Sequence, residues 1–485
     1  MNKKIFVAFL TIMLPLLSGA QALKGSYFLD NSLNRHELNP AFAPRADYFQ
    51  MLAIGNLGAG VGSNLDVPTF FYPNNGELLT FLHPSVTYSD FDKSLAQHPQ
   101  IDAEFNTTIL GFGFYTKNKS FWTFDLDLRA NIDGSLSREL FLFIKKGVGT
   151  SGQDYNLGRN DLCASAALQA SLGYSREIFK GLRVGAKARV IAPVAYMALN
   201  AEKAYLKTGY DKWSVTTEAY VHSAVNGLDL SFDEDNMPNA EFDLRRMHSN
   251  GVFAGLGYSF DLGAEYVLEA GTFLDGLSIS AAVTDLGQIR YKENVVSTHK
   301  SGGTVEWAGF QDVTLDNYDF QAALNEFAES AKENLLPLTK VETNGAFTRS
   351  AMPKVHVGVE MPFLKRSMSV GLLYSARMGQ YYTRNELTVS YNLNPCKWFA
   401  MGVNYSFLNV TKTLGFLMEF TPRVGPAFYV GCDYIPIEFA PASFVPMFNL
   451  LPTSLKFNIN FGVAFHLGDK KTKSKENSKN DNNNN

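Results

Sequence analysis

The chain has 485 residues, 13% of them aromatic, and its formal net charge of −4 is too small to favour a nucleic-acid partner. Its three cysteines are odd in number and widely spaced, so they predict neither a disulfide framework nor a metal site: Cys163, Cys396 and Cys432. Beyond the N-terminus, no stretch reaches the roughly 20 uncharged, apolar residues of a membrane-spanning helix, which excludes a helical membrane protein.

The N-terminus has the pattern of a secretory signal peptide. Lys3 and Lys4 precede an apolar run over residues 5–17, and Ala20-Gln21-Ala22 supplies the small residues of a cleavage site. The run is too short for a spanning anchor, which is the alternative interpretation. We therefore expect residues 1–22 to be removed near Ala22 and the mature protein to be exported.

Residues 23–48 precede any clear strand. They contain Asn39-Pro40-Ala41-Phe42-Ala43-Pro44, and two prolines so close together disfavour both a helix and a central strand. A weak, glycine-rich strand follows over 49–60. A segment rich in Pro, Gly and Asn then extends to about residue 104.

A hairpin is predicted over 105–115 and 121–133. In its second strand Trp122, Phe124 and Leu126 begin an apolar face, while Asp125, Asp127 and Arg129 lie on the other face. The strand is long for a soluble protein, and its polar face suits a water-filled lumen.

The same period of two continues along the chain. In 182–194 Arg183, Lys187 and Arg189 share the polar face, and in 455–467 apolar residues alternate with polar or small ones over the whole strand. The remaining predicted strands are 162–174, 252–268, 277–285, 354–361, 368–377, 386–393, 399–407, 412–420 and 426–434.

Two segments depart from this pattern. Within 286–351, apolar residues from Phe320 to Leu335 recur at helical spacing after Asp319, which predicts one helix in an outer loop. Residues 469–485 are a Lys, Ser and Asn tract, for which we expect a disordered, solvated tail.

The strands number about fourteen, and the loops between them alternate in length. Six short connections fall at one end. The long ones fall at the other, over 61–104, 134–161, 195–251, 286–353 and 435–454, together with shorter ones near Gly379 and Asn409. Short periplasmic turns and long outer loops are typical of outer-membrane barrels. The sequence thus predicts an all-β fold: a transmembrane antiparallel barrel over 49–468 with an N-terminal segment at 23–48.

Three features together resemble the FadL-type superfamily of outer-membrane barrels. They are Asn39-Pro40-Ala41 near the N-terminus, the strand count, and Ala282-Val283-Thr284-Asp285-Leu286-Gly287 at the end of a strand. The chain is most similar to an uncharacterised family of this kind, related to the PorP/SprF barrels associated with type IX secretion. The resemblance implies that residues 23–48 fold into the lumen as a hatch, with Asn39 and Pro40 lodged inside the wall.

Catalytic and metal-binding patterns were weighed against this interpretation. His222, His248, His356 and His466 lie on or near strands, but no nucleophile elbow, zinc-protease helix or cofactor motif accompanies them. Asp233-Glu234-Asp235 lacks the remaining elements of a calcium loop. We expect no enzyme, metal or cofactor unless a histidine and a carboxylate meet in the lumen.

The charged residues predicted for the lumen allow two interpretations. In the first, these charges, together with Asn39 and Pro40, bind a solute or hold the hatch. In the second, they form a network of both signs that keeps the interior hydrated and rigid. The charged residues are Asp125, Asp127, Arg129, Arg183, Lys187 and Arg189.

The predicted function is an outer-membrane channel or transporter of a Gram-negative bacterium, for hydrophobic or amphipathic small molecules. The alternative is a non-transporting barrel that anchors a secretion or surface-attachment machine. The partners implied are outer-membrane lipid, a lipidic ligand and a secretion protein.

Overall fold

The computed structural model describes residues 23–468 except 52–53, 75–76, 117–119, 147–152, 209–212, 233–237, 243–244, 246–250, 270, 272, 293–295, 308–338, 344, 409–411, 438, 442–449 and 453–454. The predicted signal peptide, the helix after Asp319, the acidic Asp233-Glu234-Asp235, His248 and the polar tail lie outside these residues. No helix among the described residues is both long and apolar enough to cross a membrane.

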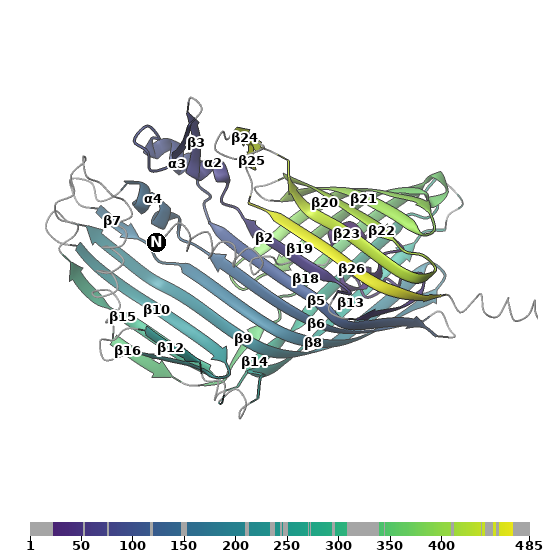
Figure 1. The fold of residues 1–485 in the computed structure, drawn as a ribbon, viewed down its shortest axis with the longest axis horizontal. Coiled ribbons are helices and arrows are strands. Elements are labelled where there is room, and N and C mark those ends of the chain that lie inside the picture. The colour runs from purple at the N-terminus through teal and green to yellow at the C-terminus, as the bar shows by residue number, and fades with distance from the viewer. Residues whose placement is uncertain are drawn as a thin grey trace, which may run out of the picture.

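The strands form one closed antiparallel barrel of fourteen strands, which confirms the predicted fold class (Figure 1). The first strand is made of two pieces, β1 (Asp47–Met51) and β2 (Leu57–Ser63), and both pair with the last strand, β26 (Phe457–Gly468), to close the ring. The others follow in chain order: β5 (Gln100–Tyr115), β6 (Phe121–Ser135), β8 (Asn160–Phe179), β9 (Leu182–Thr208), β13 (Gly255–Val267), β14 (Ser278–Tyr291), β18 (Lys354–Phe363), β19 (Met368–Met378), β20 (Thr383–Cys396), β21 (Phe399–Leu408), β22 (Lys412–Phe420) and β23 (Val424–Pro436).

The side chains alternate between the outside of the barrel and its lumen. Leu262 on β13 and Phe465 on β26 are 58% and 47% exposed on the outer surface, whereas Ser259 and Asp261 on β13 and Asn460 on β26 are buried inside. An apolar outer surface around a polar interior is the arrangement that lipid requires, and closure pairs the backbone polar groups. The apolar faces point outward and do not pack on one another, so the barrel is a membrane-spanning one.

Short connections gather at one end of the barrel. The connections 180–181, 268–277, 364–367, 397–398 and 421–423 lie at the end where Asp47 pairs with Gly468, and Tyr115 pairs with Phe121 at the same end. The longer connections lie at the opposite end, which we call the outer mouth. The predicted asymmetry of the loops is confirmed.

Several strand predictions were wrong in extent. The strands predicted over 162–174 and 277–285 are longer than expected, since β8 continues to Phe179 and β14 to Tyr291. The predicted strand 49–60 is interrupted between Met51 and Leu57. The strand predicted to end at Val194 continues as β9 to Thr208, because a bulge near Val194 changes the alternation without ending the pairing.

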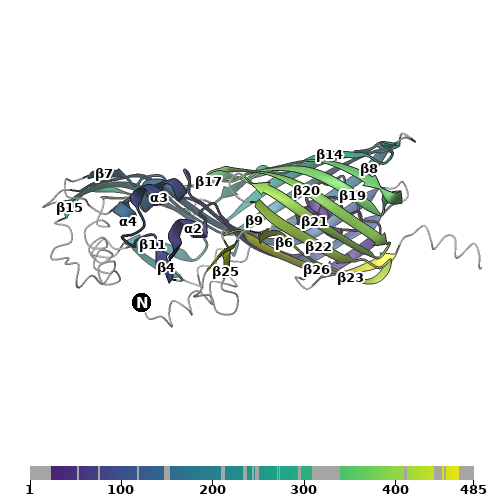
Figure 2. The ribbon, with the colours of Figure 1, turned by 90° about the horizontal axis from the view of Figure 1, so that it is seen from above.

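The outer part of β9 supports a sheet that projects beyond the barrel (Figures 1 and 2). It pairs with β10 (Trp213–Val225) on one edge and β7 (Gln153–Asn156) on the other, and β10 pairs with β15 (Val296–Trp307), which pairs with β16 (Thr339–Thr343). We call this group of strands the outer sheet.

Small elements cover the outer mouth beside that sheet. Helices α2 (Val67–Phe70), α3 (Tyr88–Ser94) and α4 (Arg138–Lys146) pack through Phe91, Leu95 and Leu142. The other described elements are the hairpins β3 (Phe71–Asn74) with β4 (Glu77–Thr80), β11 (Leu228–Phe232) with β12 (Pro238–Phe242) and β24 (Phe439–Pro441) with β25 (Leu450–Pro452), strand β17 (Phe347–Ser350) and the short helix η4 (Leu364–Arg366).

Candidate functional site

Residues 23–46 lie inside the barrel, and we call them the lumenal segment (Figure 2). The segment contains two short 3-10 helices, η1 (Lys24–Ser26) and η2 (Leu33–Glu37). Nearly all of its residues are buried, including large side chains such as Tyr27 and Leu29. It therefore fills the part of the lumen that lies away from the outer mouth.

The start of the segment is fixed by β20 and β23. The Lys24 ammonium forms an ion pair with Glu386 and donates to the Tyr434 hydroxyl at 2.7 Å. The backbone N–H groups of Lys24 and Gly25 donate to the Asp433 carboxylate at 2.8 and 3.0 Å. The ammonium thus pairs with one buried carboxylate and two amides donate to the other, so each carboxylate has hydrogen-bond donors.

The Asn39-Pro40 peptide is seated on two glycines that face each other across β9 and β13. Gly185 and Gly263 are register partners. A Cβ at Gly185 would lie 2.1 Å from the Pro40 carbonyl oxygen, and one at Gly263 would lie 2.0 Å from the Asn39 Oδ1. Only glycine permits so close an approach.

Asn39 also fixes its own backbone and the wall. Its Nδ2 donates to the Ala264 carbonyl at 3.2 Å, and its Oδ1 accepts from the Ala41 N–H at 2.9 Å. Both ends of the amide are used.

A histidine and a carboxylate do meet in the lumen. His36 Nε2 lies 3.1 Å from Asp125, which also pairs with the Lys187 ammonium at 2.9 Å. His36 Nδ1 lies 2.8 Å from the Leu33 carbonyl oxygen. Because both ring nitrogens are engaged, His36 presents no free base to a nucleophile, and the pair is not a catalytic triad.

A second cluster surrounds Arg189, which lies on β9 two residues after Lys187. Its guanidinium pairs with Asp261 at 2.7 Å and with Asp285, which lies in the left-handed region with φ of 58°. Arg129 connects this cluster to the lumenal segment, since it lies 3.6 Å from Asp285 and 3.3 Å from Glu37.

The remaining two predicted residues are Asp127 and Arg183. Asp127 accepts a hydrogen bond from Thr108 at 2.8 Å and lies near enough to Asp125 and Arg129 to interact with them electrostatically. Arg183 donates to the Ser175 hydroxyl at 3.0 Å. Five of the six predicted charges are therefore brought into one connected network around His36 and Glu37 of the segment: Asp125, Asp127, Arg129, Lys187 and Arg189.

Several lumenal residues escaped the sequence analysis. Lys24 and His36 lie in a segment without periodicity, which gave no signal. Asp261 and Asp285 were visible in principle, because Asp261 lies on the polar face of an alternating strand and Asp285 in the motif quoted for the family resemblance.

The lower edge of the segment carries a partly exposed ion pair. Arg35 lies 2.8 Å from Asp30 and stacks over the Phe42 ring, and Arg45 lies 3.3 Å from the same carboxylate. Burial alone would raise the pKa of Asp30, but the two arginines hold that pKa below its usual range. The pair therefore weakens only as the pH falls through the lowered pKa.

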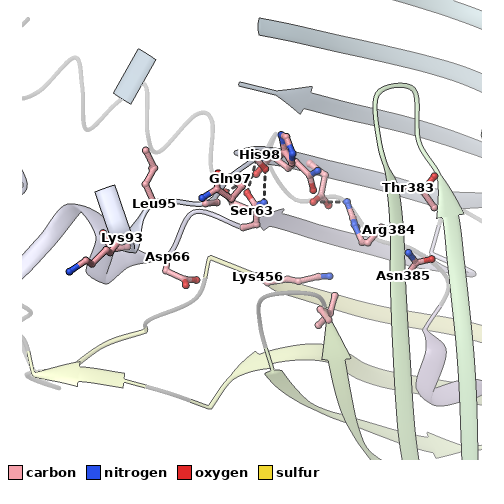
Figure 3. Close-up of a pocket in the computed structure, with 16 residues that line it drawn as sticks. Ser63, Asp66, Lys93, Leu95, Gln97, His98, Thr383, Arg384, Asn385 and Lys456 are labelled. Atoms are coloured by element: carbon pink, nitrogen blue, oxygen red, sulfur yellow. Dashed lines mark hydrogen bonds and ion pairs between the residues drawn. The ribbon is translucent and has the colours of Figure 1, made fainter. Parts of the chain in front are cut away.

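The outer mouth holds a chamber of about 540 Å³. It lies between the connection from β2 to β5 and the outer ends of β20 and β26 (Figure 3). Leu95, Ala96 and Leu408 contribute apolar surface. The charged side chains of the lining are of both signs: Lys93, Arg384, Lys456, Asp66 and Asp102.

Lys456 is the distinctive side chain of the chamber. It is 6% exposed, extends into the cavity, and its ammonium lies 4.1 Å from the centroid of the Tyr434 ring (Figure 3). Within the described part of the chain no carboxylate lies at ion-pair distance from it, although Glu386 and Asp102 act on it electrostatically. Burial and the nearby Arg384 lower the pKa of the Lys456 ammonium to about 7, and an anionic group that enters the chamber would favour its charged form.

Several solved structures are similar to this chain at low sequence identity. The Pseudomonas putida toluene transporter TodX is 10% identical over 89% of this chain and 93% of its own, with a TM-score of 0.36. The Ralstonia pickettii toluene transporter TbuX is 8% identical over 90% of this chain and 94% of its own, with a TM-score of 0.40. A Pseudomonas aeruginosa FadL homologue is 11% identical over 91% of this chain and 96% of its own, with a TM-score of 0.39.

No curated protein matches the chain. The profile of DUF5723, described as a family of unknown function, matches residues 40–433. This range runs from Pro40 of the lumenal segment to Asp433 on β23, and so covers most of the barrel. The chain therefore belongs to the DUF5723 family.

Proposed function

We propose that this protein is an outer-membrane channel for small amphipathic molecules with an anionic group. The exported, lipid-facing barrel supplies the location, since closed barrels of this kind serve bacterial outer membranes. The polar lumen supplies a route that the lumenal segment obstructs, and the segment acts as a hatch.

The chamber at the outer mouth carries the proposal. Its volume is within the range of small-molecule sites, and it combines apolar surface from Leu95 and Leu408 with the amino group of Lys456, whereas Arg384 in the same lining is paired with Asp102. An acyl or aromatic body suits the apolar surface, and a carboxylate or phosphate suits Lys456. Capture at the mouth would be passive, followed by movement of the hatch.

The predicted lumenal residues then have roles in holding the hatch. Asn39 and Pro40 occupy the glycine seat, while Asp125 and Arg129 contact His36 and Glu37 of the segment. Lys187 and Arg189 neutralise the carboxylates around these contacts. Asp127 and Arg183 maintain the polar wall.

The experiment compares two probes of equal chain length, decanoate and decanol. The purified barrel in nanodiscs is titrated with each, and we expect decanoate to bind at least tenfold more tightly. Lys456→Met removes the buried cation and should abolish the difference. Lys412→Met, at an exposed position on β22, is the matched control and should preserve it.

Transport is measured separately by swelling of liposomes that contain the protein. Entry of decanoate in wild-type liposomes, with slower entry for Lys456→Met, supports the proposal. Equal binding of both probes together with no swelling contradicts it.

One observation favours the alternative function, in which the barrel anchors a secretion or surface-attachment machine. PorP/SprF barrels are associated with a machine of this kind. The outer sheet projects beyond the mouth and ends at short strand β16 (Figure 1). Strand edges are common sites of protein pairing. Purification from native membranes separates the two functions: a stoichiometric protein partner favours the anchor, and a co-purifying amphipathic ligand favours the channel.

A further inference from the structure

Two arginines cross the lumen between the hatch and the outer chamber. Arg377 ends β19 and Arg384 begins β20, on the side of the barrel opposite β5 and β6 in the order of strands. Their partners are on that opposite wall. Contacts between neighbouring strands are ordinary in a barrel, whereas contacts between opposite strands bridge its interior.

The bridging contacts are ion pairs. Arg384 lies 2.6 Å from Asp102 on β5, and Arg377 pairs with Glu104 on the same strand. Arg377 also lies 3.7 Å from Asp133 on β6.

A neutral contact strengthens the bridge. The Tyr382 hydroxyl, in the turn between β19 and β20, donates to the Ile101 carbonyl at 3.3 Å. We call Asp102, Glu104, Asp133, Arg377 and Arg384 the ion-pair layer.

The layer separates cavities of very different size. The 540 Å³ chamber lies on its outer side and has Asp102 and Arg384 in its lining. A cavity of about 40 Å³ on its inner side is lined by Glu104 and by Glu37 of the hatch, and a cavity of about 70 Å³, lined by Arg377, shares Arg129 and Asp285 with it. A molecule that fills the chamber cannot fit in the inner cavities unless the layer opens.

We infer that the ion-pair layer is a second gate, in series with the hatch and on its outer side. Each arginine is held by carboxylates of the opposite wall, so opening requires those charges to part and become hydrated. Ion pairs suit this task better than apolar contacts, because water or an anionic solute can replace each partner. Displacement of the hatch alone then leaves the lumen closed.

The inference extends the proposed function but does not require a particular solute. Its test is the rate at which a water-soluble thiosulfonate reagent reaches a cysteine beneath the layer. The background carries Cys163→Ser, Cys396→Ser and Cys432→Ser. Ser165→Cys, in the lining of the 70 Å³ cavity, is the reporter, and Gln97→Cys, in the chamber, is the control.

The gate variant neutralises all five members of the layer, so that no partner keeps a lone charge: Asp102→Asn, Glu104→Gln, Asp133→Asn, Arg377→Gln and Arg384→Gln. We expect Ser165→Cys to react slowly in the background and at least tenfold faster in the gate variant. Gln97→Cys should react quickly in both. A second variant keeps the other substitutions of the gate variant but carries Asp102→Arg and Arg384→Asp. It restores one ion pair with its charges exchanged, and it should slow the reaction again.

Heat-dependent migration on gels shows whether each variant is a folded barrel, and only folded variants are compared. Fast reaction of Ser165→Cys with the layer intact would overturn the inference, and so would an unchanged slow rate in the gate variant. Neither result depends on decanoate, so failure of the gate and failure of the proposed transport are distinguishable.

Discussion

The barrel wall and the segment inside it are stabilised in different ways. The wall repeats one arrangement, in which an apolar side chain faces lipid and a polar one faces the lumen, and each strand pairs with two neighbours. The lumenal segment has no repeat, and single contacts hold it, such as the Lys24–Glu386 ion pair and the Asn39-Pro40 seat. The wall is redundant, whereas the segment depends on individual residues.

The largest effect is expected where the wall itself depends on one residue. Arg189→Met would leave Asp261 buried without its cation and Asp285 with only its longer contacts to Arg129 and Lys354, and we expect a loss of about 3–5 kcal/mol in the free energy of unfolding. Urea unfolding of the barrel in micelles measures it. Arg45→Met, at a pair whose arginine is 52% exposed, should cost at most about 1 kcal/mol. Equal losses would show that lumenal pairs behave like surface pairs.

The lipid-facing surface should tolerate changes of shape but not of charge. Phe461→Arg puts a cation on the outer face of β26, and we expect a loss of about 2–4 kcal/mol in the same measurement. Phe461→Leu keeps the position apolar and should change the unfolding free energy little. If the two variants are equally stable, β26 does not face lipid at this point.

The glycine seat tests how closely the segment fits the wall. Gly263→Ala places a methyl group against Asn39, and overpacking of this kind costs about 1–3 kcal/mol. The segment should also be cleaved faster by trypsin, because its basic residues become accessible. Gly345→Ala is the control, since a Cβ there meets no atom within 4 Å. Unchanged cleavage in Gly263→Ala would show that the seat does not hold the segment.

The smallest effect is expected at Asn34, whose contacts are neutral and whose partners have other bonds. Asn34 donates to the Tyr429 hydroxyl at 2.9 Å and accepts from Gln50 at 3.2 Å, while Tyr429 also bonds to Asn56 and Gln50 also donates to the Gly55 carbonyl. Asn34→Ala should therefore lower the unfolding free energy by only about 0.5–1.5 kcal/mol. Trypsin cleavage of the segment should change less than in Gly263→Ala. A larger change would place the main anchor of the segment at Asn34.

The wall was predictable from sequence because its physical requirement is local. Alternation along a strand such as 455–467 records lipid on one side and water on the other, whatever the distant residues are. The same alternation placed Asp125 and Arg189 in the lumen. It failed at β9, where the bulge near Val194 shifts the alternation.

The candidate site was much less predictable, because its contacts join residues far apart in the chain. Nothing around Lys24 indicates Glu386, and nothing around Asp102 indicates Arg384. The chamber at the mouth depends on Lys456 lying beside Tyr434 and Arg384, an arrangement that only the closed ring produces. Pairings across a ring leave no periodic trace in either strand.

The anchoring of Lys24 has a consequence for biogenesis. Its amide bonds to a carboxylate 409 positions later, and its ammonium to one 362 positions later. Contacts at such separations form late, since the intervening chain must first be ordered. The start of the lumenal segment is thus among the last parts of the barrel to be fixed, although it is synthesised early. Until β20 and β23 have joined the barrel, Lys24 has no partners and the lumen is not yet filled at this point.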